Sequence, residues 1–136
     1  MGATERAENS SLTKRLFSEF YRFTFFQAVT LLEHATGKDA RLGSALSPTG
    51  EAVRFAVKPG FAFPPSDISK LEKNRGEAPH RLEVSFLGLI GPSGILPRWY
   101  NELAMERLSQ KDTAFTAFLD IFHHRLISLF YLAWKK

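Results

Sequence analysis

The sequence predicts an α+β fold that is mostly helical, with a small sheet of two or three strands covered by helices. Two segments, "AVRFAV" and "RLEVSFL", alternate large apolar residues at a period of two, which is typical of half-buried strands. In four other segments apolar residues recur every three or four positions, as they do along one side of a helix. Because two strands alone are marginally stable, we expect the helices to pack on the sheet.

The N-terminal segment is expected to contain a helix that follows a flexible end. Residues 1–10 are polar, and we expect them to form a flexible N-terminus. Leu12, Leu16 and Phe20 then recur at helical spacing, which predicts a helix over residues 11–21.

A second helix is marked by its capping residues. Thr24 and Gln27 are three positions apart and form the pattern of a capping box, in which each side chain accepts the backbone N–H of the other residue. The helix is therefore predicted from Phe25 to Thr36, with Gly37 as a left-handed C-terminal cap.

The central segment contains the two strands and the loops around them. The strands are expected over residues 52–57 and 81–87, and more than twenty residues between them exclude a tight hairpin. Pro64 and Pro65 end a short extended piece after the first strand. Ser66 is a good capping residue, and we expect one or two helical turns to begin there.

Two further helices are predicted in the C-terminal part. Pro97 suits the first turn of a helix and marks the start of one. The other is predicted from about Thr113 to Trp134, with Asp112 as its candidate cap. We expect residues 11–136 to form a single α+β domain.

Composition limits the classes of function. The 18 basic and 14 acidic residues are interleaved, and no run of Lys or Arg has the clustered form of a nucleic-acid binder. The absence of cysteine excludes disulfides and Cys-based zinc sites. No segment has the pattern of a secretory signal or of a membrane span. We therefore expect no nucleic-acid partner and no direct membrane insertion.

Aromatic residues are candidates for contacts with a partner protein. The chain holds 13 phenylalanines, and a short chain has limited interior in which to bury them. We predict structural or partner-contact roles for Phe25 and Phe26 in the second helix and for Trp99 and Tyr100 in the third.

The segment "FLDIFHHRLISLFYLAW", residues 118–134, combines polar groups with a mostly apolar helix. A rotation of ~100° per residue places Asp120, His124 and Tyr131 on one side. We expect these three residues and Trp134 to be structural or to contact a partner. The opposite, broad apolar side is expected to pack and comprises Phe118, Phe122, Leu126, Leu129, Phe130 and Ala133.

Asp120 and His124 allow two interpretations. Their spacing suits a hydrogen bond or ion pair along the helix, worth a few tenths of a kcal/mol. The same spacing suits two ligands of a metal ion, for which His34 or His80 would have to supply a third. His123 is rotated about 100° from His124, so these neighbours do not easily share one metal. We favour the structural pair and expect no metal and no cofactor.

Arg125 is the unusual residue of the segment, because it lies among Phe118, Ile121 and Leu129 on the apolar side. An unpaired charge buried there would cost several kcal/mol. We therefore predict that a carboxylate or a set of backbone carbonyls surrounds its guanidinium, in the interior or at an interface. The alternative is that its stem extends along the helix edge to solvent.

The glycines of "FLGLIGPSGILP" are expected to form a structural turn. Gly88, Gly91 and Gly94 are three apart between a strand and a helix, where a phosphate-binding loop could occur. Neither the Gly-Lys-Ser/Thr of a P-loop nor the G-x-G-x-x-G of a dinucleotide site is present. Pro92 also lacks a backbone N–H that an anion would bind.

Taken in order, the segments resemble the TssG family of the bacterial type VI secretion system, also called ImpH/VasB. The matching stretches are "YRFTFFQAVTLLE", "RLG" with the later "GEAVRF", "LEVSFLGLIGPSGILPRWYNEL" and "FLDIFHHRLISLFYLAWKK". Relatives more often have Asn at the position of His123, which disfavours a metal-binding role for this histidine. The family is longer, so the resemblance implies that this chain is the N-terminal portion of a longer protein.

The resemblance implies a structural function without catalysis. TssG-like subunits assemble with TssF into the wedge of a phage-like baseplate and connect to TssK. The baseplate is the platform on which sheath and tube polymerise, at the cytoplasmic face of the inner membrane. For this chain the resemblance implies direct contacts with TssF, whereas the TssK-binding elements would lie largely beyond Lys136.

Two other classes of function stay open at this point. A small metal-dependent enzyme would use Asp120 and His124, and a nucleic-acid-binding module would need a basic surface that the sequence does not show. No Ser/His/Asp order or pair of carboxylates stands out as catalytic. We therefore expect no catalytic residue.

Overall fold

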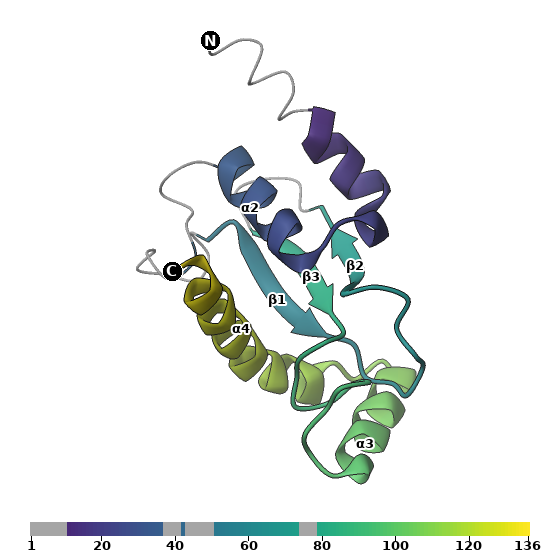
Figure 1. The fold of residues 1–136 in the computed structure, drawn as a ribbon. Coiled ribbons are helices and arrows are strands. Elements are labelled where there is room, and N and C mark those ends of the chain that lie inside the picture. Colours follow the sequence, from purple (N-terminus) through teal and green to yellow (C-terminus); the bar gives the residue numbers. More distant parts are fainter. Residues whose placement is uncertain (1–10, 37–41, 43–50, 74–78) are drawn as a thin grey trace, which may run out of the picture.

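The structure is a small mixed sheet with helices on one face and along one edge (Figure 1). It is a computed structural model that describes residues 11–36, 42, 51–73 and 79–136. Residues 11–18 are helical. The elements that follow are η1 (Phe20–Arg22), α2 (Phe25–Thr36), β1 (Val53–Val57), β2 (Ile68–Glu72), β3 (His80–Val84), α3 (Arg98–Ser109) and α4 (Ala114–Lys135). This arrangement confirms the predicted α+β class.

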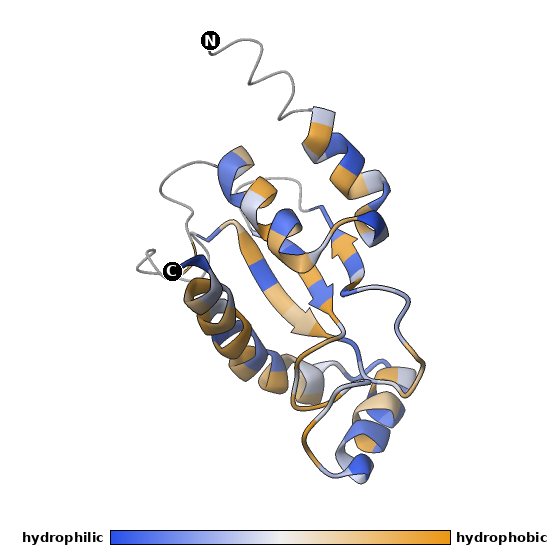
Figure 2. Cartoon of the chain, in the orientation of Figure 1, coloured by the Kyte–Doolittle hydropathy of each residue, from blue (hydrophilic) through white to orange (hydrophobic). Residues whose placement is uncertain are grey.

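The sheet has the order β1-β3-β2, with β1 parallel and β2 antiparallel to β3. Phe55 lies opposite Leu82 in this register, and Leu71 lies opposite the same residue, so the three side chains share one face. That face is apolar and buried. The other face carries charges, and the two colours alternate along the strands in Figure 2. Its charged residues are Arg54, Lys70, Glu72, Arg81 and Glu83.

The main core lies between the apolar face of the sheet, α2 and the C-terminal half of α4. Phe25, Val29 and Leu32 of α2 are at most 1 % exposed and belong to the same cluster as the strand residues. Ile127 and Tyr131 bring α4 into this cluster. Because β1 is an edge strand with α4 along it, the helix covers the side of β1 that has no neighbouring strand (Figure 1).

The start of α2 agrees with its predicted capping residues, whereas the predicted cap Asp112 lies one residue before the N-cap of α4, which is Thr113. Thr24 and Gln27 form the capping box, with N···O distances of 3.1 and 3.2 Å. The Asp112 carboxylate accepts the Ala114 N–H at the start of α4 (3.0 Å), and Pro97 immediately precedes α3. The predicted cap Gly37 lies outside the described residues. No helix in the described ranges is long and apolar enough to span a bilayer.

The helical turns predicted from Ser66 are wrong, because residues 68–72 form strand β2 instead. Ser66 does not cap a helix: its hydroxyl donates to the Ile68 carbonyl (2.7 Å). Pairing with β3 selects the extended conformation, and an irregularity between Ile68 and Lys70 shifts the register. This shift puts Ile68 and Leu71 on one face although they are three residues apart, which is a spacing more typical of helices.

A smaller apolar cluster joins α3 to the N-terminal half of α4. Ile90, Ala104 and Leu119 are its buried members, and each comes from a different segment. Tyr100 and Phe115 pack against them. The loop before α3 is therefore held between two helices.

Candidate interaction surface

The inward side of α4 carries the polar residues of this helix. Strand β1 pairs only with β3, so every second N–H of β1 points away from the sheet and needs another acceptor. Helix α4 supplies these acceptors from its side chains. The residues that it buries are Thr116, Leu119, His123, His124, Ile127, Ser128 and Tyr131.

His124 binds β1 and a buried glutamate at the same time. The N–H of Phe55 donates to His124 Nδ1 (3.1 Å), and His124 Nε2 lies 2.7 Å from Glu51 Oε2. Because a backbone N–H can only donate, Nδ1 is the acceptor and the proton is on Nε2, which donates to Glu51. The imidazole also stacks on the Phe55 ring, with centroids 5.6 Å apart. Both ring nitrogens are thus occupied by protein groups.

Asp120 and His123 hold the next part of α4. The N–H of Val57 donates to Asp120 Oδ1 (3.3 Å), and His123 Nδ1 lies 2.8 Å from the same oxygen. The other nitrogen of His123, Nε2, accepts the N–H of Leu89 (3.0 Å). Arg81 lies 3.7 Å from Asp120 Oδ2. His123 is fully buried and joins α4 to the glycine-containing loop.

The predicted pair between Asp120 and His124 is wrong, since each residue has another partner. Asp120 pairs with His123 three positions on, and His124 turns towards Glu51 because the loop before β1 places that carboxylate beside it. Two metal ligands would need free nitrogen lone pairs, and backbone N–H groups occupy them on both histidines. Among the described residues no group of three His, Asp or Glu could hold a metal ion.

Tyr131 connects the C-terminal half of α4 to α2. Its hydroxyl donates to Glu33 Oε1 (2.7 Å) and lies 3.1 Å from Thr30 Oγ1. The second oxygen of Glu33 accepts the N–H of Leu42 (3.0 Å), and Lys135 Nζ is 3.6 Å from Oε1. Burial raises the pKa of Tyr131 to about 12. The buried carboxylates Glu33 and Glu51 were not predicted as site residues, because their partners are far away in the sequence.

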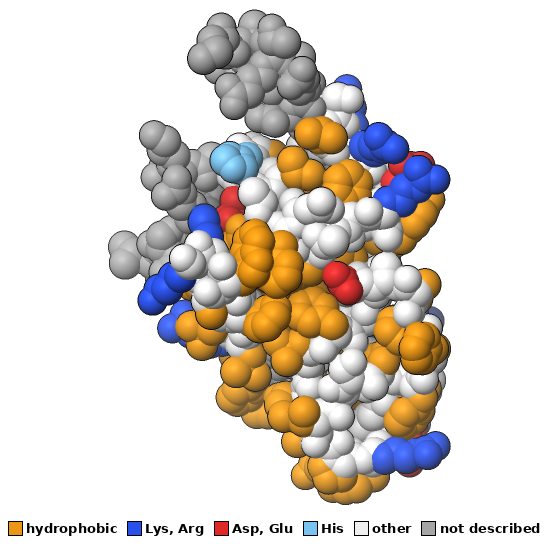
Figure 3. Space-filling model, in the orientation of Figure 1, with side chains coloured by type: hydrophobic (Ala, Val, Ile, Leu, Met, Phe, Trp, Pro, Cys, Tyr) orange, Lys and Arg blue, Asp and Glu red, His pale blue; other side chains and the backbone are white. Residues whose placement is uncertain are grey.

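The outward side of α4 is apolar and open to solvent. We call this surface the outward face; each of its large apolar side chains is 46–58 % exposed. They are Phe118, Ile121, Phe122, Leu126 and Leu129. Of the residues predicted to pack on this side, Phe130 contacts the rings of Phe25 and Phe86. The others stay exposed, and within the described residues α4 packs on the sheet through its opposite side. Figure 3 shows hydrophobic side chains gathered over α4. A contiguous apolar surface of this kind is typical of a protein–protein interface.

Arg125 lies in the middle of the outward face and is exposed. The prediction that it is buried within this chain is wrong, because the side of the helix that carries it faces away from the sheet. No ion pair of Arg125 is found with the described residues. Its predicted contact with a carboxylate at an interface stays a prediction.

Next to the outward face, stacked aromatic rings connect the C-terminal end of α4 to α2. Phe26 and Trp134 stack with centroids 4.3 Å apart, and Phe26 also stacks on Phe130 (5.8 Å). A hollow of about 680 Å³ lies next to them, between the helix of residues 11–18, α2 and Trp134. The neighbouring Phe25 belongs to the core instead. Of these predicted partner-contact aromatics, Trp134 is thus exposed, Phe26 is partly buried against the core, and Phe25 is buried.

A comparison with known protein families assigns the chain to one of them. Residues 19–136, most of the chain, match the family described as type VI secretion, TssG. The chain belongs to this family. The suspected resemblance is confirmed, and the protein is a component of the type VI secretion baseplate. No match was found among curated proteins or among solved structures.

The aromatic pair Trp99 and Tyr100 lies at the start of α3 in this TssG-family chain. The two rings stack with centroids 3.8 Å apart. Trp99 is 56 % exposed, whereas Tyr100 packs on the small cluster of α3 and α4. Only Trp99 is therefore available to a partner.

The glycine-containing loop of the TssG-family chain is a tight turn held by Asn101. Gly91 has a φ of +89°, and a Cβ there would lie 2.8 Å from Val57 Cγ1. Asn101 Oδ1 accepts the N–H groups of Gly91 (3.2 Å) and Gly60 (2.9 Å) and so joins two loops. A Cβ on Gly88 would also meet Val57 (2.9 Å), and one on Gly94 would meet the Ile90 backbone (2.8 Å).

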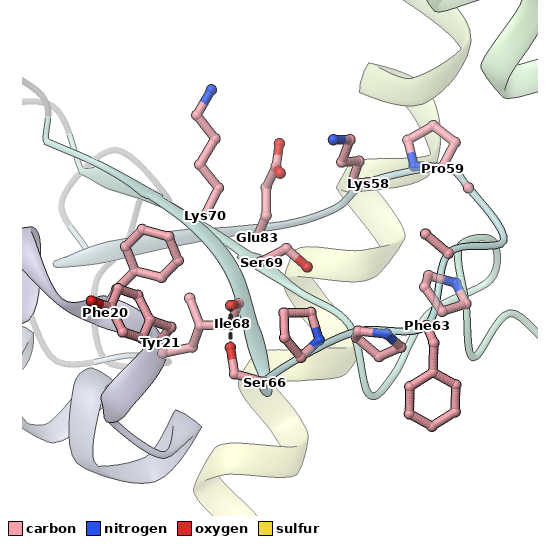
Figure 4. Close-up of a pocket in the computed structure, with 15 residues that line it drawn as sticks. Phe20, Tyr21, Lys58, Pro59, Phe63, Ser66, Ile68, Ser69, Lys70 and Glu83 are labelled. Carbon is pink, nitrogen blue, oxygen red and sulfur yellow. Dashed lines mark hydrogen bonds between the residues drawn. The ribbon is translucent and has the colours of Figure 1, made fainter.

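A second hollow, of about 520 Å³, lies between η1, β2 and the loop after β1 (Figure 4). Lys58, Lys70 and Glu83 point the same way from the sheet, while Phe63 points away from the other labelled side chains. Burial raises the pKa of the Glu83 carboxyl, and Arg81 at 3.3 Å acts in the opposite direction. Among the described residues that line this hollow, Glu83 is the one carboxylate, so they do not offer the pair of carboxylates used in glycoside hydrolysis.

Proposed function

We propose that the chain is a structural, non-enzymatic wedge subunit of the type VI secretion baseplate and binds TssF through the outward face of α4. The observation that carries this proposal is the row of apolar side chains on α4 that the fold leaves exposed. Burying half-exposed Leu and Phe side chains against a partner contributes roughly 1 kcal/mol each.

The proposal extends to the rest of the assembly. The chain contributes, with TssF, to the wedge that connects to TssK and supports polymerisation of sheath and tube. Its location is the cytoplasmic face of the inner membrane when assembled. Membership in the TssG family and the resemblance in the sequence support these assignments.

The polar groups of α4 support a structural role over catalysis. The histidine nitrogens bind backbone N–H groups and carboxylates, and these contacts leave no lone pair for a substrate or a metal. A general base needs an acceptor that can reach a substrate proton. We therefore place these residues in the attachment of α4 to the sheet.

Charge pairing does not favour a nucleic-acid-binding module. Several exposed basic residues have an acidic neighbour within 4 Å, which reduces their attraction for phosphate. Among the described residues these pairs include Arg15–Glu19, Lys70–Glu72, Arg81–Glu83, Arg98–Glu102 and Arg107–Asp112.

The test is co-purification of the protein with TssF after co-expression. Leu126→Glu places a charge in the outward face and is expected to lower the recovery of TssF at least tenfold, while the thermal unfolding temperature stays unchanged. Met105→Glu is the matched control, because Met105 is an apolar residue of α3 with similar exposure, 41 % against 46 %. Equal recovery of TssF with Leu126→Glu and with wild type would remove α4 from the interface.

A further inference from the structure

The outward face of α4 has the residue spacing of a helix-packing seam. Phe118, Phe122, Arg125 and Leu129 follow one another at steps of four, three and four residues. This alternation keeps side chains in one line along a helix and is the spacing by which two helices interlock. The seam is about 17 Å long at 1.5 Å per residue. All four side chains are exposed.

Apolar neighbours flank this seam on both sides. Ile121 and Leu126 lie beside Phe122 and Arg125, and each is about half exposed. Such flanking residues form the walls of the holes into which side chains of a second helix insert. A strand would match this surface poorly, because its side chains repeat every two residues.

Arg125 is the one charged residue of the seam. Its neighbours one turn away on α4 are Ile121, Phe122, Ser128 and Leu129, none of which carries a negative charge. Asp120 is turned inward, where it binds Val57 and His123. A helix that covered the seam would remove Arg125 from water, so its guanidinium would need hydrogen-bond acceptors from that helix. A carboxylate meets this need and also balances the charge, whereas the backbone carbonyls of a helix are already bonded within it. Among the described residues, this chain offers no carboxylate within reach.

We infer that the partner lays an amphipathic α-helix along α4 and places an aspartate or glutamate opposite Arg125. This inference rests on the proposed function, since it takes the outward face as the surface that binds another baseplate subunit. Shape alone would let the partner helix slide by a turn along the apolar seam. A charge pair in the middle fixes one register, as polar residues do in the seams of coiled coils. Arg125 thus determines specificity, and the apolar residues supply affinity.

The first test uses substitutions of Arg125 in the complete protein, co-expressed with the baseplate subunit that it binds. Arg125→Met leaves the partner carboxylate buried and unpaired, so the dissociation constant is expected to rise by at least about 30-fold. Arg125→Glu adds repulsion and is expected to weaken binding further. The matched control is Arg107→Met on α3, a residue that is half exposed and outside the seam. Binding of Arg125→Met equal to that of wild type would overturn the inference.

The second test identifies the residue that faces Arg125. Phe122→benzoylphenylalanine puts a photoreactive aromatic ring one turn from Arg125, and mass spectrometry then locates the crosslink on the partner. We expect a helical site with an Asp or Glu within one turn. Exchanging that acid for Lys should restore binding to Arg125→Glu. Crosslinks to a strand or loop, crosslinks to a second copy of this chain, or failure of the exchange would overturn the inference.

Two outcomes separate this inference from the proposed function. If Leu126→Glu abolishes binding while every Arg125 variant binds normally, the outward face is the interface but the charge pair is absent. If Leu126→Glu also binds normally, the proposed function of the outward face fails.

Discussion

On its inward side α4 presents Asp120, His123 and His124 to backbone N–H groups of β1 and of the glycine-containing loop. On its outward side it presents large apolar residues to solvent. Hydropathy alone favours the opposite orientation, with the apolar side on the sheet. The difference arises because an edge strand leaves N–H groups that must be satisfied, and each unsatisfied N–H would cost about 1–3 kcal/mol. Polar side chains therefore attach this helix to the sheet.

Exposure of the outward side leaves the isolated chain less stable than it would be with this side covered. Its apolar side chains are about half exposed, so a free energy of burial of roughly 5 kcal/mol is gained only when a partner covers the helix. The inward hydrogen bonds hold the helix in this orientation and keep the apolar side accessible. Under the proposed function, the inward side supports folding and the outward side supports assembly, and single substitutions can separate the two.

The largest expected effect on stability comes from His124→Leu. This change removes the hydrogen bonds that the His124 ring makes to the Glu51 carboxylate and to the Phe55 N–H in the interior. Because His124 Nδ1 accepts a backbone N–H, the loss is that of two buried hydrogen bonds, one of them to a carboxylate, and we expect it to cost about 2–5 kcal/mol in urea unfolding followed by circular dichroism. The control is His34→Leu, an exposed histidine at the end of α2, with an expected change below about 0.5 kcal/mol. A loss below 1 kcal/mol for His124→Leu would show that α4 is not held through this residue.

Tyr131→Phe is expected to have an intermediate effect. It removes the hydrogen bond to Glu33 and is expected to cost about 1–2 kcal/mol at pH 7. Burial raises the pKa of Tyr131 to about 12 from its usual 10. The folded state therefore keeps the phenol proton more tightly than the unfolded state does. This contribution is fully present below pH 10 and is lost as the pH rises towards 12.

The pH dependence gives a sharper measurement than the loss at neutral pH. Between pH 10 and 12, wild type is expected to lose more stability than Tyr131→Phe, because the variant has no phenol to ionise. Tyr21→Phe is the control, since Tyr21 is 53 % exposed. Parallel stability curves for wild type and Tyr131→Phe in this range would contradict the burial of the hydroxyl.

Much of the fold could be predicted from the sequence, because its signals are local. The capping box of Thr24 and Gln27 marks the start of α2, and the period-two alternation marks β1 and β3. Strand β2 could not be predicted, because pairing with β3 decides its conformation and a register shift hides its alternation. Ser66 favours a helix start only where no neighbouring strand competes.

The candidate site was predictable only in part. Periodicity separated the polar side of α4 from its apolar side, and it identified Arg125 as a charge among apolar residues. It did not show which side faces the sheet. That choice depends on the N–H groups of Phe55 and Val57 and on the Glu51 carboxylate, all more than sixty residues away from their partners. No local pattern reports such contacts.

The smallest expected effect is that of Ile121→Gln on the outward face. Ile121 is 58 % exposed, so little burial is lost, and glutamine has a slightly better helix propensity than isoleucine. We expect the free energy of unfolding to change by less than about 0.5 kcal/mol. Ile127→Gln is the matched control on the same helix, because Ile127 is fully buried. Placing an amide there without a hydrogen-bond partner is expected to cost at least about 3 kcal/mol.

This pair of variants tests the orientation of α4 directly, since both exchange the same residue types six positions apart. Urea unfolding of the two proteins should give clearly different midpoints, with Ile121→Gln close to wild type. For correctly folded protein, the two variants should rank in the reverse order in their effect on binding to the baseplate partner. Ile121→Gln is expected to weaken the complex by roughly tenfold, and more than Ile127→Gln, because it replaces an apolar side chain at the interface. If Ile121→Gln destabilised the isolated protein as much as Ile127→Gln, the apolar side of α4 would have to be packed inside the fold.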